Sequence, residues 1–160
     1  MKKLRLVIIS DSHRRQGTVD KIISLEKEAS HIFFLGDVTS DIEDFDIIYP
    51  DKKFHIVSGN CDFMSRYPLG DIAIIGTHRV FYTHGHLYGV KSGIGTITQK
   101  ARQLDCDIAL FGHTHISHTS YENGIYVVNP GSCSAPRQGG PSYAVIDIEK
   151  NGIMPIIKYI

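Results

Sequence analysis

Residues 107–115 read DIALFGHTH, an apolar run that stops at a glycine and is followed by two histidines, His113 and His115. A short apolar run bounded by polar residues is typical of a buried strand. A soluble protein has little structural use for two imidazoles on so short a turn. The stretch therefore predicts a strand that carries two histidines to a functional site at its carboxyl end.

The same arrangement recurs upstream, where apolar runs end in aspartate, asparagine or histidine. The runs and the residues that follow them are 4–9 with Asp11 and His13, 31–35 with Asp37, 54–58 with Asn60, and 79–82 with His84 and His86. The carboxyl ends of neighbouring strands in an open α/β sheet line one crevice. If these strands share a sheet, the side chains converge on one edge. Carboxylates and imidazoles in that number indicate a metal site, since they are costly to bury unpaired.

Each of these residues also has an ordinary interpretation when it is taken alone. Asp11 could cap a helix, and Asp37 or Asn60 could be a turn residue. A single buried histidine is more often hydrogen-bonded than metal-bound. The metal interpretation depends on their joint occurrence at five successive strand ends.

The remaining pattern predicts one α/β domain over residues 1–160. Helical spacing of apolar residues follows the first strand from Thr18, and a second helix is expected over 96–104. Strand, helix and strand in that order favour parallel pairing. Asn-Gly pairs at 123–124 and 151–152 lie between apolar runs, which predicts two hairpins near the end of the chain.

Composition narrows the classes of function. Lys plus Arg equals Asp plus Glu at 17 each, so no global field favours a long nucleic-acid track or an anionic membrane. No apolar stretch approaches the ~20 residues needed to span a bilayer. The three cysteines are scattered, which suits a reducing compartment. We therefore expect a cytoplasmic location.

Five short blocks of the sequence resemble the signature of the calcineurin-like metallophosphoesterases. The blocks are Asp11-Ser-His13, Gly36-Asp37, Gly59-Asn60, His84-Gly-His86 and Gly112-His113-Thr-His115, against D-x-H, GD, GN, HGH and GHTH. The short chain is similar to the compact bacterial and archaeal phosphodiesterase branch. The resemblance implies an α/β fold in which two mixed β-sheets pack face to face as a sandwich, flanked by α-helices, in four layers.

The resemblance also implies two divalent metal ions and their ligands. One ion would take Asp11, His13 and His115, the other would take Asn60, His84 and His113, and Asp37 would bridge them. Mixed nitrogen and oxygen ligands favour Mn, Fe, Zn, Ni or Co over Mg or Ca. Manganese is the first choice, and the sequence leaves the other four open.

The implied reaction is hydrolysis of a small phosphodiester by a hydroxide that bridges the two metals, with Asp37 and Asn60 in the catalytic set. Many members of the family have GNHD, and that histidine is thought to assist the leaving group. Here Cys61 takes its place, and a thiol is a poor proton donor near neutrality. His86 is the alternative acid. Arg137 and Arg14 are candidate contacts to the substrate phosphate.

Two other functions stay open at this point. The chain could be a non-catalytic protein-binding scaffold, similar to the small subunit of the retromer coat, or it could be a phosphomonoesterase. Small relatives commonly self-associate, so a homo-oligomer is also open.

Overall fold

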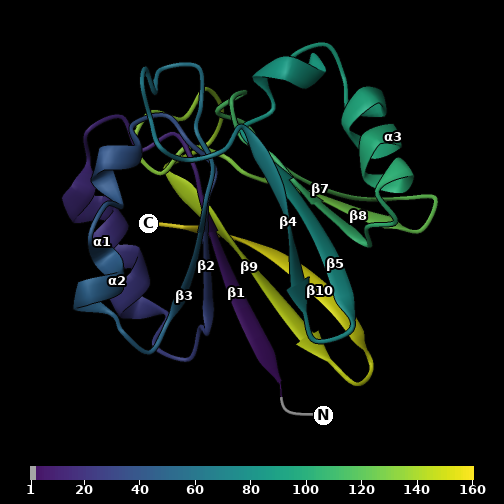
Figure 1. The fold of residues 1–160 in the computed structure, drawn as a ribbon, viewed down its shortest axis with the longest axis horizontal. Helices are drawn as coiled ribbons and strands as arrows, with labels where there is room; N and C mark the ends of the chain where they lie inside the picture. Colours follow the sequence, from purple (N-terminus) through teal and green to yellow (C-terminus); the bar gives the residue numbers. More distant parts are fainter. Residues whose placement is uncertain (1–2) are drawn as a thin grey trace.

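The fold, seen in a computed structural model that describes residues 3–160, consists of two five-stranded mixed sheets packed face to face (Figure 1). The first sheet has the order β10-β9-β1-β2-β3 and the second has the order β4-β5-β6-β8-β7. The strands of the first sheet are β1 (Leu4–Ile9), β2 (His31–Phe34), β3 (Lys53–Ile56), β9 (Ser142–Glu149) and β10 (Gly152–Tyr159). Those of the second are β4 (Gly70–Ile75), β5 (His78–Thr83), β6 (Ile108–Leu110), β7 (Ser117–Glu122) and β8 (Ile125–Pro130). The predicted sandwich of mixed sheets is therefore confirmed.

The helices lie outside the two sheets, as expected for four layers. They are α1 (Gln16–Leu25), α2 (Phe45–Ile48) and α3 (Gly95–Gln103), with 3-10 turns η1 (Thr39–Asp41) and η2 (His86–Tyr88). In Figure 1, α1 and α2 cover one outer face and α3 covers the other. The prediction that Thr18 caps the first helix is wrong, because α1 begins at Gln16 and no side chain caps it. None of the helices within residues 3–160 combines the length and the apolar character needed to cross a membrane.

The strand ends that carry the ligand-type residues do not share one sheet, which corrects the simplest sequence expectation. β1, β2 and β3 belong to the first sheet, whereas β5 and β6 belong to the second. Within each sheet these strands run parallel. Their carboxyl ends point to the same end of the sandwich, at the top of Figure 1, so the loops that follow them still meet.

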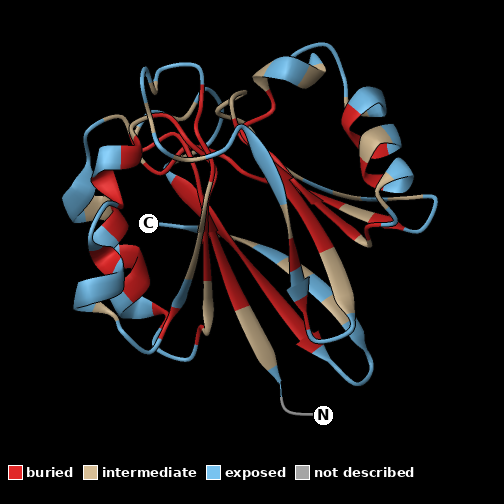
Figure 2. Ribbon diagram, in the orientation of Figure 1, coloured by how far each residue is buried: buried red, intermediate tan, exposed pale blue. Residues whose placement is uncertain are grey.

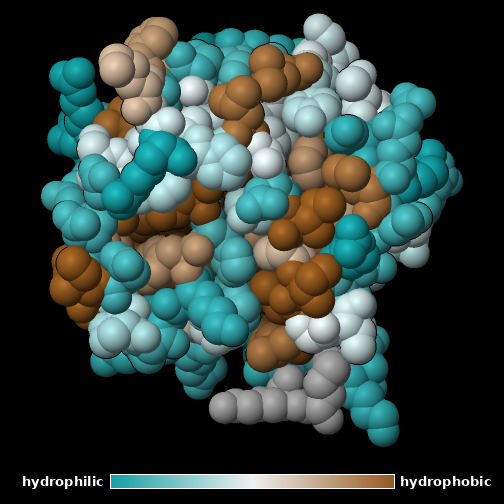
Figure 3. All heavy atoms as spheres, viewed as in Figure 1, coloured by the Kyte–Doolittle hydropathy of each residue, from teal (hydrophilic) through white to brown (hydrophobic). Residues whose placement is uncertain are grey.

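The alternation of side chains along the strands produces three apolar layers. Leu6, Ile8 and Phe33 of the first sheet meet Val80 and Leu110 of the second between the sheets. The opposite faces of the same strands pack against α1 and α2, and the second sheet packs against α3. Figure 2 shows that buried residues run along the central strands and extend into the loops at the upper end of the sandwich. In Figure 3 hydrophobic side chains also gather at the surface over β4 and β5.

A partly buried ion-pair network joins the two inner strands β1 and β9 of the first sheet to the end of α1. Arg5 on β1 lies opposite Asp147 on β9, and its guanidinium donates two hydrogen bonds of 2.8 and 2.9 Å to that carboxylate. A third bond of 3.2 Å reaches Glu26 at the end of α1. The hydrogen bonds from Arg5 lower the pKa of Asp147 to about 2, against the opposing effect of burial.

We predict that Asp147→Asn lowers the free energy of unfolding at pH 7 by about 2 kcal/mol. The folded pKa lies below the unfolded value, so this stabilisation is present above about pH 4 and disappears as the pH falls toward 2. Urea unfolding of both proteins from pH 7 to pH 3 tests it. Asp46→Asn, on the exposed side of α2, is the control. A difference between Asp147→Asn and the parent that does not shrink on acidification would contradict the prediction.

Candidate metal centre

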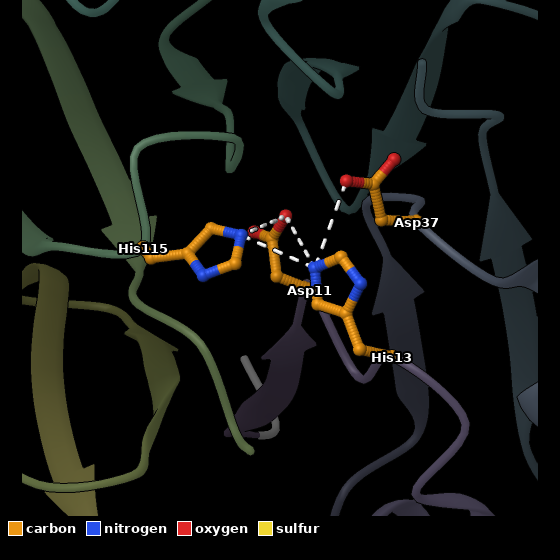
Figure 4. Close-up of side chains that lie close together, drawn as sticks. All are labelled: Asp11, His13, Asp37 and His115. Atoms are coloured by element: carbon orange, nitrogen blue, oxygen red, sulfur yellow. Dashed lines mark hydrogen bonds and ion pairs between the residues drawn. The ribbon is translucent and has the colours of Figure 1, made fainter. Parts of the chain in front are cut away.

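Seven residues predicted from the sequence meet where the loops after β1, β2, β3, β5 and β6 converge. They are Asp11, His13, Asp37, Asn60, His84, His113 and His115. Six of them form two groups, Asp11-His13-Asp37-His115 and Asp37-His84-His113, and within each group the potential ligand atoms all lie within 4.8 Å of one another. Asn60 contacts the second group. Figure 4 shows the first group, with the side chains pointing toward a common centre.

The first group has the spacing of ligands around one ion. The Nε2 atom of His13 lies 3.2 Å from Nε2 of His115 and 3.8 Å from Oδ2 of Asp37. Oδ1 of Asp11 lies 3.3 Å from Nε2 of His115. Metal–ligand bonds of ~2.1 Å place two donors of one ion about 3–4 Å apart. These side chains could therefore bind a cation without large rearrangement.

The second group has the same spacing around His84. Its Nε2 atom lies 3.2 Å from Nδ1 of His113, 3.1 Å from Oδ1 of Asn60 and 3.4 Å from Oδ2 of Asp37. Asn60 is exposed, whereas His84 is fully buried. The group therefore opens toward solvent on the side of Asn60.

Asp37 is common to both groups, and the same carboxylate oxygen faces both of them. Oδ2 faces both His13 and His84, while Oδ1 accepts a hydrogen bond of 3.0 Å from the backbone N–H of Cys61. Burial favours the neutral acid, but the hydrogen bond and charge of His84 outweigh it and hold the pKa of Asp37 well below its usual range. Asp37 is therefore an ionised carboxylate placed between the two groups.

Asp11 provides a direct test of whether a cation fits. Its side chain is completely buried, and Oδ2 accepts hydrogen bonds from Ser10 Oγ and the His113 N–H. Oδ1 has no hydrogen-bond partner among residues 3–160, and it faces the imidazoles of His13, His84 and His115. An unpaired buried carboxylate oxygen is costly. A divalent cation would satisfy it, so the donor set fits a metal.

Backbone carbonyls fix the orientation of two of the imidazoles. Nδ1 of His84 donates to the carbonyl of Leu35, and Nδ1 of His115 donates to the carbonyl of Ala135, both at 2.7 Å. Each bond leaves Nε2 directed into the site, as in many metal-binding histidines. Burial and the charge of His84 lower the pKa of His113 to about 4, so its ring is neutral at physiological pH. A neutral imidazole is the form that binds metals.

The ligand-type residues themselves adopt an uncommon backbone conformation. Asp11, His13, Asp37, His113 and His115 all have φ between 44° and 68°. This left-handed region is unfavourable for residues other than glycine. Sequence analysis had no signal for it at these positions.

Close backbone packing explains the glycines beside the ligands. A Cβ atom on Gly36 would collide with the backbone of Gly59, and one on Gly59 would collide with Asp37. The GD and GN loops therefore touch directly, and only glycine fits where they meet.

Two aspartates that were not predicted as site residues hold these loops in place. Asp62 accepts backbone N–H groups from Asp37, Val38, Thr39 and Gly59 at 2.7–2.9 Å. Asp41, which the sequence left without a role, is buried and accepts hydrogen bonds from Ser12 and from the N–H of Arg15. Asp62 could have been found from its place at the end of the stretch Gly59-Asn60-Cys61-Asp62. No local pattern marked Asp41 as a site residue.

The remaining candidate residues surround the two groups. Cys61 is exposed, and burial and the charge of Asp37 raise the pKa of its thiol. His86 stacks at an angle against His84, with ring centroids 5.4 Å apart, and burial lowers its pKa. Arg14 and Arg137 are exposed and line different hollows: Arg14 lines one with Cys61, and Arg137 lines another with Thr114.

Comparison with known proteins supports the same family. Residues 4–151 match the family model of the calcineurin-like phosphoesterase superfamily domain. The probable metallophosphoesterase YsnB of Bacillus subtilis is 31% identical over 151 residues, which cover 92% of this chain and 86% of YsnB.

Other relatives carry different names. Vacuolar protein sorting-associated protein 29 of Schizosaccharomyces pombe is 31% identical over 75% of this chain and 69% of its own. The phosphodiesterase YfcE of Escherichia coli K12 is 31% identical over 66% of this chain and 56% of its own.

A solved structure agrees over the full length. A predicted phosphoesterase from Streptococcus pneumoniae superposes with a TM-score of 0.81, at 24% identity, over 99% of both chains. The family model covers most of the sequence. The matched residues include the buried carboxylate of Asp37 and the two clusters of imidazoles that share it. The chain belongs to the calcineurin-like phosphoesterase superfamily.

Proposed function

We propose that this protein is a metal-dependent phosphodiesterase that hydrolyses small phosphodiesters. The observation that carries the proposal is the position of Asp37, whose Oδ2 faces His13 on one side and His84 on the other. Two divalent cations held there supply the Lewis acidity that acidifies water and neutralises charge on a phosphoryl group. Asp11, His13 and His115 would hold one cation, Asn60, His84 and His113 the other, with Asp37 between them.

The chemistry of the donors favours a transition metal, with manganese first. Each group mixes imidazole nitrogen with carboxylate or amide oxygen, which suits Mn, Fe, Zn, Ni or Co. Mg and Ca prefer oxygen donors alone.

Residues outside the ligand set would position the substrate. Arg137 and Arg14 are exposed in different hollows and can each offer a forked set of donors to a phosphate. The lowered pKa of His86 keeps its ring neutral near pH 7, which makes it a weak proton donor. The raised pKa of Cys61 keeps that thiol protonated, so it is neither a nucleophile nor a strong acid. We infer that diesters with good leaving groups are the preferred substrates.

The similarity to vacuolar protein sorting-associated protein 29 makes protein binding the second candidate function. The unpartnered Oδ1 of Asp11 argues against a purely structural site, because a scaffold gains nothing from a buried carboxylate oxygen that lacks a donor. Cytoplasmic location, self-association and the absence of long nucleic-acid partners stay predictions from the sequence.

We predict that Asp37→Asn weakens Mn²⁺ binding and lowers the kcat/KM for bis(p-nitrophenyl) phosphate by about 100-fold or more. The amide keeps the shape of the carboxylate but removes the charge that both groups share. Calorimetric titration with Mn²⁺ and hydrolysis of the diester measure the two effects. Asp71→Asn, on the exposed edge of β4, is the matched control. If Asp37→Asn binds Mn²⁺ as tightly as the parent, the proposed centre is wrong.

A second prediction concerns Cys61. Cys61→His restores an imidazole at this position, and we expect it to raise the rate on substrates with poor leaving groups, such as alkyl phosphate esters, by about tenfold or more. The rate on p-nitrophenyl esters should change little, because that leaving group needs no proton. Cys61→Ser serves as the control. Unchanged rates on both classes of ester would show that this position takes no part in the reaction.

A further inference from the structure

A cavity of about 310 Å³ lies beside the candidate metal centre, and of the residues that line it only Arg137 has a role in the proposed chemistry. Val90, Ile94, Phe111 and Ile116 contribute apolar side chains. The polar residues around it are Lys91, Thr114, Ser117, His118 and Arg137. Its size falls at the lower end of the range for small-molecule sites, which start near 300 Å³.

The cavity adjoins the metal centre through residues that neighbour the ligands. Thr114, which lines the cavity, lies between His113 and His115 in the sequence, and the N–H of Arg137 donates to the carbonyl of His115 at 3.0 Å. Val90 packs directly beneath Gly85, where an added Cβ would lie 3.0 Å from Cγ2 of Val90.

Two positively charged side chains, Lys91 and Arg137, line the cavity beside the metal centre. Lys91 lines the cavity and directly follows Val90, which packs against Gly85 between His84 and His86. Arg137 also lines the cavity, and its backbone is hydrogen-bonded to His115 of the metal centre. An anion bound at the metal centre would therefore have positive charge on the side that faces the cavity.

We propose that this cavity binds the aromatic ester group, of benzene to nucleobase size, of a phosphodiester whose phosphate lies at the metal centre. Branched aliphatic side chains present the apolar surface that the faces of a flat ring require. Lys91 and Arg137 can pair with the phosphate or lie over the ring. Ser117 and His118 offer hydrogen-bonding groups to ring heteroatoms. The inference rests on the proposed phosphodiesterase function and names the class of substrate.

Two phosphonates that differ only in their organic group test this without any turnover. We expect Mn²⁺-loaded protein to bind phenylphosphonate about tenfold or more tightly than methylphosphonate in calorimetric titrations, because the ring buries apolar surface. Ile94→Gln and Ile116→Gln, each made separately, should reduce that ratio to about 1–2 and leave the affinity for methylphosphonate unchanged. Lys91→Gln should weaken both phosphonates by similar factors.

The matched control is Ile74→Gln, at an exposed position of β4, which should leave both affinities unchanged. Thermal unfolding and Mn²⁺ content establish that each variant is folded and loaded. Equal affinity of the parent for the two phosphonates, or a ratio that survives both cavity substitutions, overturns the assignment of the cavity while the phosphodiesterase proposal stands. Failure of Mn²⁺ or of both phosphonates to bind overturns the proposed function, and the cavity assignment falls with it.

Discussion

The burial of two carboxylates among four imidazoles is the constraint around which the upper end of this sandwich is organised. Asp11 is completely enclosed and Asp37 nearly so, and each lies within 4 Å of two or more histidine nitrogens. Such charges cannot be removed from water without compensation. Ser10, the N–H of Cys61 and the imidazole of His84 provide part of this compensation. A cation would provide the rest by binding the unpaired oxygen of Asp11.

Holding these side chains in one place imposes a cost on the backbone. Residues that would ordinarily avoid positive φ adopt it at five of the ligand positions. Asp62 offsets part of this cost, because one carboxylate collects four N–H groups from the loops after β2 and β3. Strained loops of this kind persist where the surrounding structure over-determines them. The rigid strands below, whose side chains fill the apolar layers, provide that support.

Much of the fold could be predicted from the sequence, since each apolar run had the length and flanks of a buried strand. The five short blocks of aspartate, asparagine and histidine, four of which contain glycine, also named the residues that meet at the candidate site. The division of the strands between two sheets was not visible from the residues, because an apolar run carries no information about which sheet it joins. Asp41 was given no site role for a similar reason: its partner Ser12 lies 29 residues away, and only the folded chain brings them together. The cavity beside Thr114 likewise combines residues from 90 to 137.

The two sheets contribute unequal halves of the proposed ligand set: Asp11, His13, Asp37 and Asn60 follow strands of one, and His84, His113 and His115 follow strands of the other. Neither half alone assembles either cluster. A nascent chain that has formed only β1, β2 and β3 therefore offers an incomplete cage. The full set of ligands would exist only once strands of both sheets have come together.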